Sequence, residues 1–351
     1  MPLLARMVGL PLSVDVRRGA VKGLGPLLAD RRISAEGRVA VAVGPGQGER
    51  VVASLRPTLG GAEVFHVEGG TVDAAEGLAD DLQRGWYDAV VGIGGGRTID
   101  VAKYAASRSG LPMVAVATSL AHDGLASPVA SLEHKGRKGS YGVHLPIAVI
   151  VDIEFVLHCP PEQLRSGIGD AVSNLTALAD WELAGRERGE PIDGLAVALA
   201  RTGAEALLRR TDDLSSETFL TTLAEALILG GVAMAVAGSS RPCSGACHEI
   251  AHAIDELYPG TASHGEEVAV GSLFAAHLQR SPVRPALEAC LRRHGVPRTP
   301  QDLGLTEDEF VAAVLEAPAT RPDRYTILEH RGMDEAEIRR ELATFLDAVA
   351  A

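Results

Sequence analysis

The pattern of hydrophobic positions divides the chain into two halves of different kind. In the first half, short runs of β-prone apolar residues alternate with segments of helical period. The runs predict strands at residues 12–16, 38–43, 62–67, 89–91, 113–117 and 146–152. The segments between them predict helices at residues 21–28, around 51–55, at 71–83 and from Thr98 onward. This alternation is typical of a parallel sheet that is covered by helices on both faces.

The second half shows only helical periodicity. Beyond Pro160-Pro161 the pattern predicts helices at residues 170–183, 194–210, 216–237, 248–258 and 266–280, with several more before the C-terminus. Before that boundary, apolar residues on both sides of a polar, basic segment between Ser127 and His144 predict a β-hairpin. A chain of 351 residues is long for one core, so we expect two domains. We place an α/β domain at residues 1–158 and an all-helical domain at residues 159–351.

Composition and charge narrow the class of protein. The chain is 46% hydrophobic and 23% charged, which is ordinary for a globular enzyme. A net charge of −13 argues against a nucleic-acid partner, but a local nest of N–H groups can still hold a small phosphorylated ligand. The first residues carry too short an apolar run for a signal peptide, and no stretch approaches the ~20 apolar residues of a membrane span. We therefore expect a cytoplasmic protein whose four cysteines are reduced thiols.

A glycine-rich turn follows the strand predicted at residues 89–91. Gly92, Gly94, Gly95 and Gly96 remove side chains from the turn, and Thr98 can cap the helix that follows. Free N–H groups and the positive end of the helix dipole then point at one place, where a phosphate can bind. The alternative is a tight turn without a ligand, because a lone glycine cluster is weakly specific.

The loop at residues 117–127 follows the carboxyl end of the next predicted strand, where open α/β sheets bind ligands. Thr118 and Ser119 offer hydroxyls to a cofactor, and Asp123 offers a carboxylate to a substrate hydroxyl. The alternative is that Asp123-Gly124 is only a turn.

Acidic and imidazole side chains gather in the helical half. His248 and His252 lie in His-Glu-Ile-Ala-His and share one helix face, as in zinc proteases, although nothing else in the chain suggests a protease. Asp170, His248 and His264 form a second combination, which suits divalent zinc or iron. Such a metal can polarise an alcohol or carbonyl oxygen next to a nicotinamide that exchanges hydride. Two partly buried histidines, or a zinc site that includes Cys243 and Cys247, are the alternatives.

Several motifs in this order resemble the glycerol-1-phosphate dehydrogenases, within the wider superfamily of dehydroquinate synthases and iron-containing alcohol dehydrogenases. The resemblance covers about residues 10–280 and rests on the segments 88–103, 117–127, 167–184, 240–245 and 264–266. It implies a Rossmann-like N-terminal domain, a helical C-terminal domain and an active site in the cleft between them. It further implies reduction of dihydroxyacetone phosphate to sn-glycerol 1-phosphate with NADH or NADPH, a reaction of phospholipid metabolism, in a homo-oligomer.

The resemblance also implies roles for individual residues. Asp170, His248 and His264 would bind the metal, usually zinc, with iron as the alternative. His252 would line the substrate site and take part in a proton relay, and Asp123 would contact the substrate. The cofactor-binding residues would be Gly94, Gly95, Gly96, Asp100, Thr118, Ser119 and Ser127.

Two features depart from the family pattern. Cys247 precedes the ligand His248, where these dehydrogenases tend to carry Glu, and the chain after about residue 280 has no counterpart that we can match. The chief alternative function is a sugar phosphate cyclase of the dehydroquinate synthase type, which uses NAD transiently. The chain has only four lysines, which does not fit the lysine-rich substrate site of such a cyclase. A non-catalytic nucleotide-binding protein is the third possibility. No acid directly follows the strand at 38–43, so neither NAD nor NADP is excluded.

Overall fold

The computed structural model describes residues 9–350, which form two compact units. The sheet unit comprises the chain up to Leu120 together with Gly124–Cys159 and Met234–Gly238. The helical unit comprises Ala121–Asp123, Pro160–Ala233 and the chain from Ser239 onward. The N-terminal run that we compared with a signal peptide lies within residues 1–8, outside the described residues.

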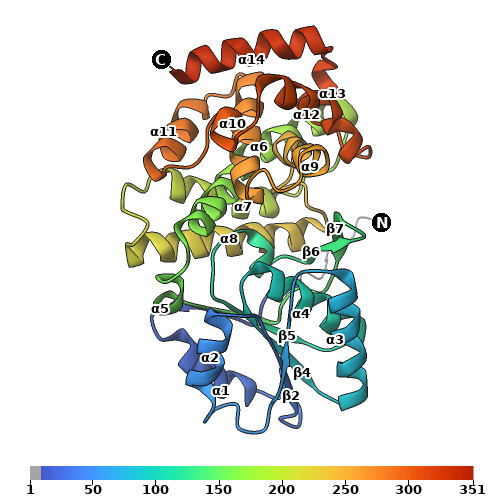
Figure 1. The fold of residues 1–351 in the computed structure, drawn as a ribbon, viewed down its shortest axis with the longest axis vertical. Coiled ribbons are helices and arrows are strands. Elements are labelled where there is room, and N and C mark those ends of the chain that lie inside the picture. The colour runs from blue at the N-terminus through green and yellow to red at the C-terminus, as the bar shows by residue number, and fades with distance from the viewer. Residues whose placement is uncertain (1–8, 351) are drawn as a thin grey trace. The chain divides into compact units, whose positions relative to one another are not determined.

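The sheet unit is built on six parallel strands in the order β1-β8-β5-β4-β2-β3. The strands are β1 (Ser13–Arg17), β2 (Val39–Val43), β3 (Glu63–His66), β4 (Ala89–Gly94), β5 (Met113–Ala117) and β8 (Ala148–Asp152). The helices are η1 (Ala20–Gly23), α1 (Leu24–Leu28), α2 (Gln47–Leu55), α3 (Val72–Gly85), α4 (Gly96–Ser109) and α5 (Ile153–Val156), with a short η2 (Asp123–Leu125) in a loop. Helices α1 and α2 cover one face of the sheet and α3 and α4 the other (Figure 1). The predicted α/β class is confirmed.

Alternation along the strands explains why both faces of this sheet are buried. Val39 and Val41 of β2, with Val91 of β4 and Val114 of β5, face the core that is closed by η1, α1 and α2. The residues between them point to the opposite face, where α4 packs. β2, β4, β5 and β8 are buried at every position, as is usual for strands inside a parallel sheet.

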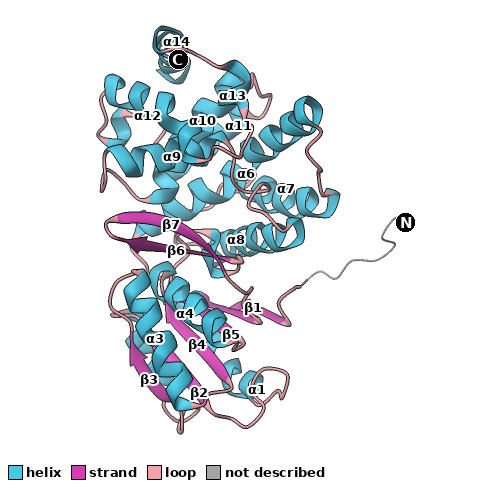
Figure 2. Ribbon diagram, turned by 90° about the vertical axis from the view of Figure 1, so that its right-hand side faces the viewer, coloured by secondary structure: helices cyan, strands magenta, loops and turns pink. Residues whose placement is uncertain are grey.

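The predicted hairpin is present as a separate two-stranded antiparallel sheet. It pairs β6 (Val129–His134) with β7 (Arg137–Gly142), and Figure 2 shows the two strands side by side. Lys135 and Gly136 form the turn with φ angles of 52° and 78°, the conformation of a two-residue hairpin loop.

The predicted start of the glycine-turn helix is wrong in detail. β4 continues through Gly92 to Gly94, and α4 begins at Gly96 with Gly95 at its N-cap position and no side-chain cap. Thr98 lies inside the first turn of the helix and packs against the glycines instead. A Cβ at Gly94 would lie 2.7 Å from Thr98 Oγ1, and one at Gly44 would lie 2.1 Å from the same atom.

The helical unit contains the all-helical region that the periodicity predicts. Its helices are α6 (Pro161–Arg188), α7 (Gly194–Leu208), α8 (Glu217–Ala237, which ends in the sheet unit), α9 (Ala246–Leu257), α10 (His264–Leu278), α11 (Arg284–His294), η3 (Gln301–Leu303), α12 (Glu307–Thr320), α13 (Ile327–Arg331) and α14 (Glu335–Ala350). Helix α6 begins nine residues earlier than predicted, since Pro161 is well suited to a first helical position. Asp170 therefore lies within a long helix rather than at the start of one.

One helix corrects our expectation about membrane spans. By length and composition α8 could cross a membrane, and 72% of its most apolar window is buried inside the protein. It has the burial of a core helix, and no other helix among the described residues meets the same criterion.

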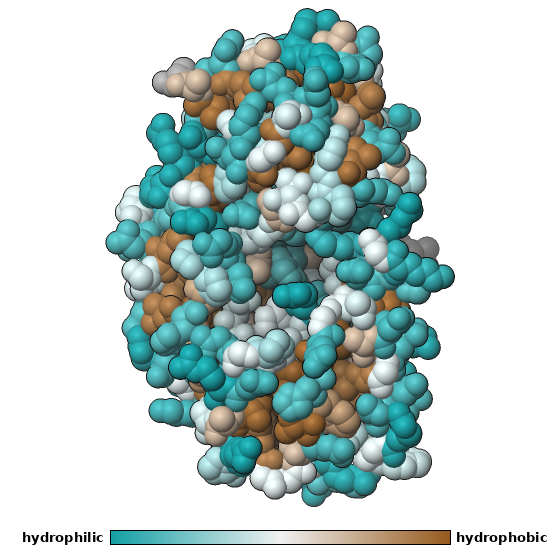
Figure 3. Space-filling view, viewed as in Figure 1, coloured by the Kyte–Doolittle hydropathy of each residue, from teal (hydrophilic) through white to brown (hydrophobic). Residues whose placement is uncertain are grey.

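Figure 3 shows hydrophobic side chains scattered between hydrophilic ones on the face that it draws, as expected for a folded protein surface. The four cysteines are free and buried in this structure.

Candidate active site

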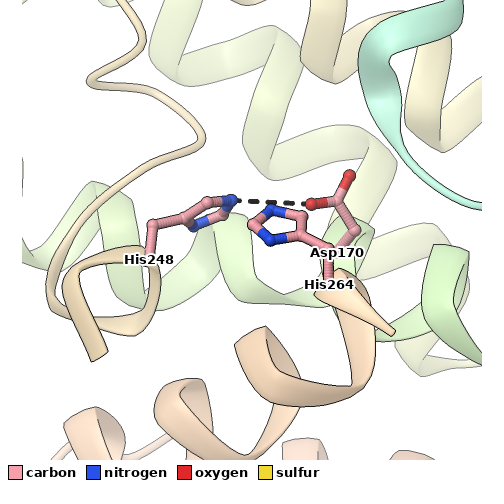
Figure 4. Close-up of side chains that lie close together, drawn as sticks. All are labelled: Asp170, His248 and His264. Atoms are coloured by element: carbon pink, nitrogen blue, oxygen red, sulfur yellow. Dashed lines mark ion pairs between the residues drawn. The ribbon is translucent and has the colours of Figure 1, made fainter. Parts of the chain in front are cut away.

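Asp170, His248 and His264 lie together in the helical unit. They come from α6, α9 and α10, and one ligand atom of each lies within 4.8 Å of the others. Their side chains point toward one another (Figure 4), and His248 Nε2 lies 3.6 Å from Asp170 Oδ1. Asp170 is buried, and His248 is nearly so.

Glycines beside two of these residues allow their helices to meet backbone to backbone. Gly169 precedes Asp170 on α6, and Gly265 follows His264 on α10. A Cβ on Gly169 would lie 2.1 Å from the Gly265 carbonyl oxygen, and a Cβ on Gly265 would lie 1.9 Å from the Ser166 carbonyl oxygen. Ser166 Oγ also accepts a hydrogen bond from the Gly265 N–H at 3.1 Å. The two glycines therefore set the spacing between Asp170 and His264.

The three side chains fit a divalent metal ion. A carboxylate and two imidazoles are ligands that zinc and ferrous iron accept. Two ligand atoms, each about 2.1 Å from a tetrahedral metal, lie about 3.4 Å apart. The distance of 3.6 Å between His248 Nε2 and Asp170 Oδ1 is close to this value.

The electrostatics of the cluster favour a positive charge at its centre. Burial raises the pKa of the Asp170 carboxyl, but His248 and His264 outweigh that effect and hold this pKa below its ordinary value. Burial lowers the pKa of His248, while Cys247 and Asp170 raise it to about 10. A metal cation at the same place would take over the role of the proton on His248.

Two side chains of the cluster have partners that orient them. Asp170 Oδ2 accepts a hydrogen bond from the backbone N–H of Asp123 at 2.8 Å, which leaves Oδ1 to face His248. His248 Nδ1 lies 3.3 Å from Cys247 Sγ, so its Nε2 faces Asp170. Metal-binding histidines usually bond through their second ring nitrogen in this way, and the partner fixes the tautomer and the ring orientation.

His264 lies within a second group of possible ligands. Its ring nitrogen and one carboxylate oxygen each of Asp255 and Glu267 lie within 4.8 Å of one another. Glu267 is fully buried and comes three residues after His264 on α10, hence on the same helix face. Carboxylates in such positions commonly hold the ring of a metal-binding histidine.

His252 lies beside the cluster without belonging to it. Its ring centroid is 6.3 Å from that of His248 and 5.8 Å from that of His264. Burial, followed by repulsion from His264 and Arg321, lowers the pKa of His252 well below its ordinary value. The neutral ring can then accept a hydrogen bond at Nε2 from Arg321 Nη2, 3.2 Å away.

The environment of Glu249 differs from that of the catalytic glutamate in a His-Glu-x-x-His protease, which must reach a metal-bound water. It is fully buried, and its Oε2 accepts a hydrogen bond from Thr326 Oγ1 at 2.9 Å. Burial and the neighbouring Glu329 raise its pKa to about 9. Glu249 is thus engaged by Thr326 as part of the packed interior.

The sheet unit brings the glycine turn next to the loop at residues 117–127. Gly94 pairs with Ala117 in neighbouring strands, and the Thr118 N–H donates to the Gly94 carbonyl at 2.9 Å. A Cβ on Gly95 would lie 3.2 Å from Ser119 Oγ. Gly94, Gly95, Thr118 and Ser119 therefore share one edge of the sheet with the N-terminus of α4, where phosphates bind readily.

Asp100 and Ser127 are buried beside the loop at residues 117–127. Asp100 is buried, and its Oδ1 is 3.0 Å from Nζ of the fully buried Lys103. The same ammonium donates to the carbonyl oxygens of Gly124 at 2.5 Å, Ser127 at 3.3 Å and Val129. Lys103 thus holds the loop in shape, and Asp100 balances its charge.

Sequence reasoning missed three of these contacts. The pair Asp100 and Lys103, three residues apart on one helix, was a signal for the first. The unusual residue before His248 was a signal for the role of Cys247. No feature of the sequence indicated the contact between Arg321 and His252, because the two residues lie 69 positions apart.

Comparison with known proteins agrees with the fold and the motifs. The model of the iron-containing alcohol dehydrogenase family matches residues 15–160. Glycerol-1-phosphate dehydrogenase [NAD(P)+] of Staphylothermus marinus is 34% identical over 334 residues, covering 93% of this chain and 94% of that protein. The protein of the same name from Thermofilum pendens is 39% identical over 326 residues, covering 91% and 92%.

Solved structures share the two-part fold at low sequence identity. A probable glycerol dehydrogenase from Sinorhizobium meliloti 1021 superposes with a TM-score of 0.78 at 22% identity, covering 99% of both chains. Sulfoacetaldehyde reductase from Bifidobacterium kashiwanohense, solved in complex with NAD+, gives 0.74 at 16% identity, covering 97% of this chain and 99% of that one. These likenesses concern the fold alone. The extent and identity of the sequence matches confirm the expected resemblance, and the chain belongs to the glycerol-1-phosphate dehydrogenase family.

Proposed function

We propose that this protein is a metal-dependent oxidoreductase that interconverts dihydroxyacetone phosphate and sn-glycerol 1-phosphate with NAD(P)H. The observation that carries the proposal is the convergence of Asp170, His248 and His264 from three helices, in a chain whose relatives bear that enzyme name. In the reducing direction, NAD(P)H gives a hydride to the substrate carbonyl carbon, and the oxygen gains a proton.

We assign the metal to Asp170, His248 and His264, with zinc as the ion and ferrous iron as the alternative. When bound, it supplies Lewis acidity to the substrate oxygen. Asp123 holds the Asp170 carboxylate through its backbone N–H. We further propose that the Asp123 side chain contacts the substrate and that His252, whose ring lies beside those of His248 and His264, passes a proton.

We assign the cofactor phosphates to the glycine turn. The turn from Gly94 to Gly96 exposes backbone N–H groups at the start of α4, and Thr118 and Ser119 add hydroxyls at the same sheet edge. Asp100 and Ser127 act indirectly, through the loop that Lys103 holds. At the carboxyl end of β2 the chain continues as Gly44-Pro45-Gly46. No acid at that point repels a 2′-phosphate, so we expect NADH and NADPH both to serve.

The test is oxidation of NADH and of NADPH by the purified zinc-loaded protein on addition of dihydroxyacetone phosphate. The product should be inert to an enzyme specific for sn-glycerol 3-phosphate, because the two are mirror images. His264→Ala should lose both bound metal and activity while its circular dichroism stays unchanged. His144→Ala, at an exposed histidine outside the cluster, is the matched control.

Two outcomes would contradict the proposal. Absence of turnover with this ketone, combined with phosphate release from a heptulosonate phosphate, would identify a cyclase instead. Full activity and full metal content in His264→Ala would refute the ligand assignment.

A further inference from the structure

A cavity of about 540 Å³ lies in the helical unit, lined by other residues than the metal cluster. Its volume falls in the range of small-molecule sites. The charged and imidazole side chains that line it are Arg280, Arg284, Arg331, Arg340, His277 and Glu341. They come from the end of α10, the start of α11, and α13 and α14.

The balance of charge in this cavity is positive. Glu341 is the one acid among its lining residues, and it already bonds Arg331 Nη2 at 2.6 Å and His277 Nε2 at 3.0 Å. Arg331 holds the pKa of Glu341 below its ordinary value, and burial lowers the pKa of His277. At neutral pH, four guanidinium groups therefore surround one carboxylate and one neutral imidazole.

Three of the four arginines have no close carboxylate partner among the described residues. Arg284 Nε and Nη2 are buried and make no hydrogen bond within the described chain, and its nearest carboxylate, Glu288, lies 3.5 Å away. Arg280 forms no ion pair with any described residue. Its backbone has a φ of 49°, a conformation that glycine adopts more easily. Arg340 has only a loose contact of 3.8 Å with Glu337.

This concentration of arginine is unexpected in a chain of net charge −13. The Arg284 side chain is only 20% exposed, and a cation buried to this degree normally has a close counter-ion. The other arginines of the cavity are exposed. Arginine recognises phosphate and carboxylate groups through paired hydrogen bonds. Helix α11 begins at Arg284, so the positive end of its dipole adds to the same field. We propose that the cavity binds a small soluble polyanion, of the class of phosphorylated metabolites.

The cavity is separate from the metal cluster. His277 lines it near the end of α10, whereas His264 stands at the first position of that helix. Thirteen residues at 1.5 Å each place these two histidines about 20 Å apart along the helix. The proposal therefore stands independently of the proposed catalytic function.

Isothermal titration of the metal-loaded protein with inorganic pyrophosphate and with orthophosphate, at constant ionic strength, tests the proposal. We expect pyrophosphate to bind more tightly, because several arginines can share its charges. Arg284→Gln and Arg340→Gln should each weaken its binding about tenfold or more, the effect of losing a charge-assisted hydrogen bond.

Arg339→Gln is the matched control. Arg339 is the neighbour of Arg340 on α14, lies outside the cavity lining and pairs with Asp308 and Glu335, so this variant should bind like the wild type. Circular dichroism and the rate of NAD(P)H oxidation without added anion should be unchanged in all three variants. Wild-type affinity in the double variant Arg284→Gln/Arg340→Gln would show that pyrophosphate binds elsewhere. Absence of binding to the wild type at millimolar pyrophosphate would equally refute the proposal.

Discussion

The close contact between α6 and α10 gives a sharp test of how the metal cluster is built. In Gly265→Ala the new methyl group would lie 1.9 Å from the Ser166 carbonyl oxygen, whereas real contacts of this kind stay above 3.0 Å. The two backbones must therefore separate by at least about 1.1 Å. His264 is the residue next to this contact, and metal–ligand distances tolerate only about 0.2 Å.

We expect Gly265→Ala to lose stability and metal binding together. Overpacking of this kind costs about 1–3 kcal/mol, which urea unfolding of the metal-free protein measures. Metal affinity, measured by chelator competition, should fall more than about 100-fold. A loss of that size is the most that usually follows removal of a hydrogen-bond partner of a metal ligand, and here a ligand itself is displaced.

Gly77→Ala in α3 is the control, because nothing lies within 4 Å of its added Cβ. It should raise stability by about 0.5–1 kcal/mol, as alanine does at an unhindered helix position. If Gly265→Ala unfolds at the same urea concentration as the wild type and retains full metal affinity, glycine contact does not set the geometry of the site.

Three further predictions follow from contacts in the two units. Cys247→Ala should weaken metal affinity about 10–100-fold because His248 Nδ1 loses its partner. Cys247→Ser should keep most of the metal affinity, and equal affinities in the two variants would show that the side chain of Cys247 does not orient His248. Lys103→Met should cost about 3–5 kcal/mol in urea unfolding, since it leaves the buried Asp100 carboxylate unpaired, whereas Lys22→Met at an exposed position should change little. Gly44→Ala should destabilise the protein through its clash with Thr98 Oγ1, and adding Thr98→Ala should recover at least about 1 kcal/mol; strictly additive effects would disprove the contact.

The fold was largely predictable because its two halves carry different hydrophobic periods. Val39–Val43 and Met113–Ala117 are apolar at every position and bounded by turn residues, which leaves little choice but a buried strand. The start of α4 was misplaced, because Thr98 is a good capping residue by type. Its side chain instead packs in the space next to Gly44 and Gly94. This packing could be predicted only if the segments that meet in the fold were known.

Residue type and order in the sequence were enough to predict the side chains of the metal cluster, but not their hydrogen-bond partners. Asp170, His248 and His264 were proposed as metal ligands from their chemistry and from family motifs, and the structure brings the three side chains together. Their partners depend on packing between distant segments. Arg321 reaches His252 from the end of α12, and no spacing rule connects residues so far apart in the chain.

The surroundings of Lys103 have a consequence for chemical rescue. Three backbone carbonyl oxygens and the Asp100 carboxylate converge on its ammonium group, and a set of oxygens like this resembles the coordination sphere of a potassium ion. Shortening the side chain in Lys103→Ala would leave an oxygen-lined space with a negative charge. Small alkylammonium ions should then enter and restore the stability lost, in proportion to their concentration, and sodium chloride at equal ionic strength should not. The Lys103 ammonium group thus occupies the position of a bound monovalent cation, held in place by its covalent attachment to the chain.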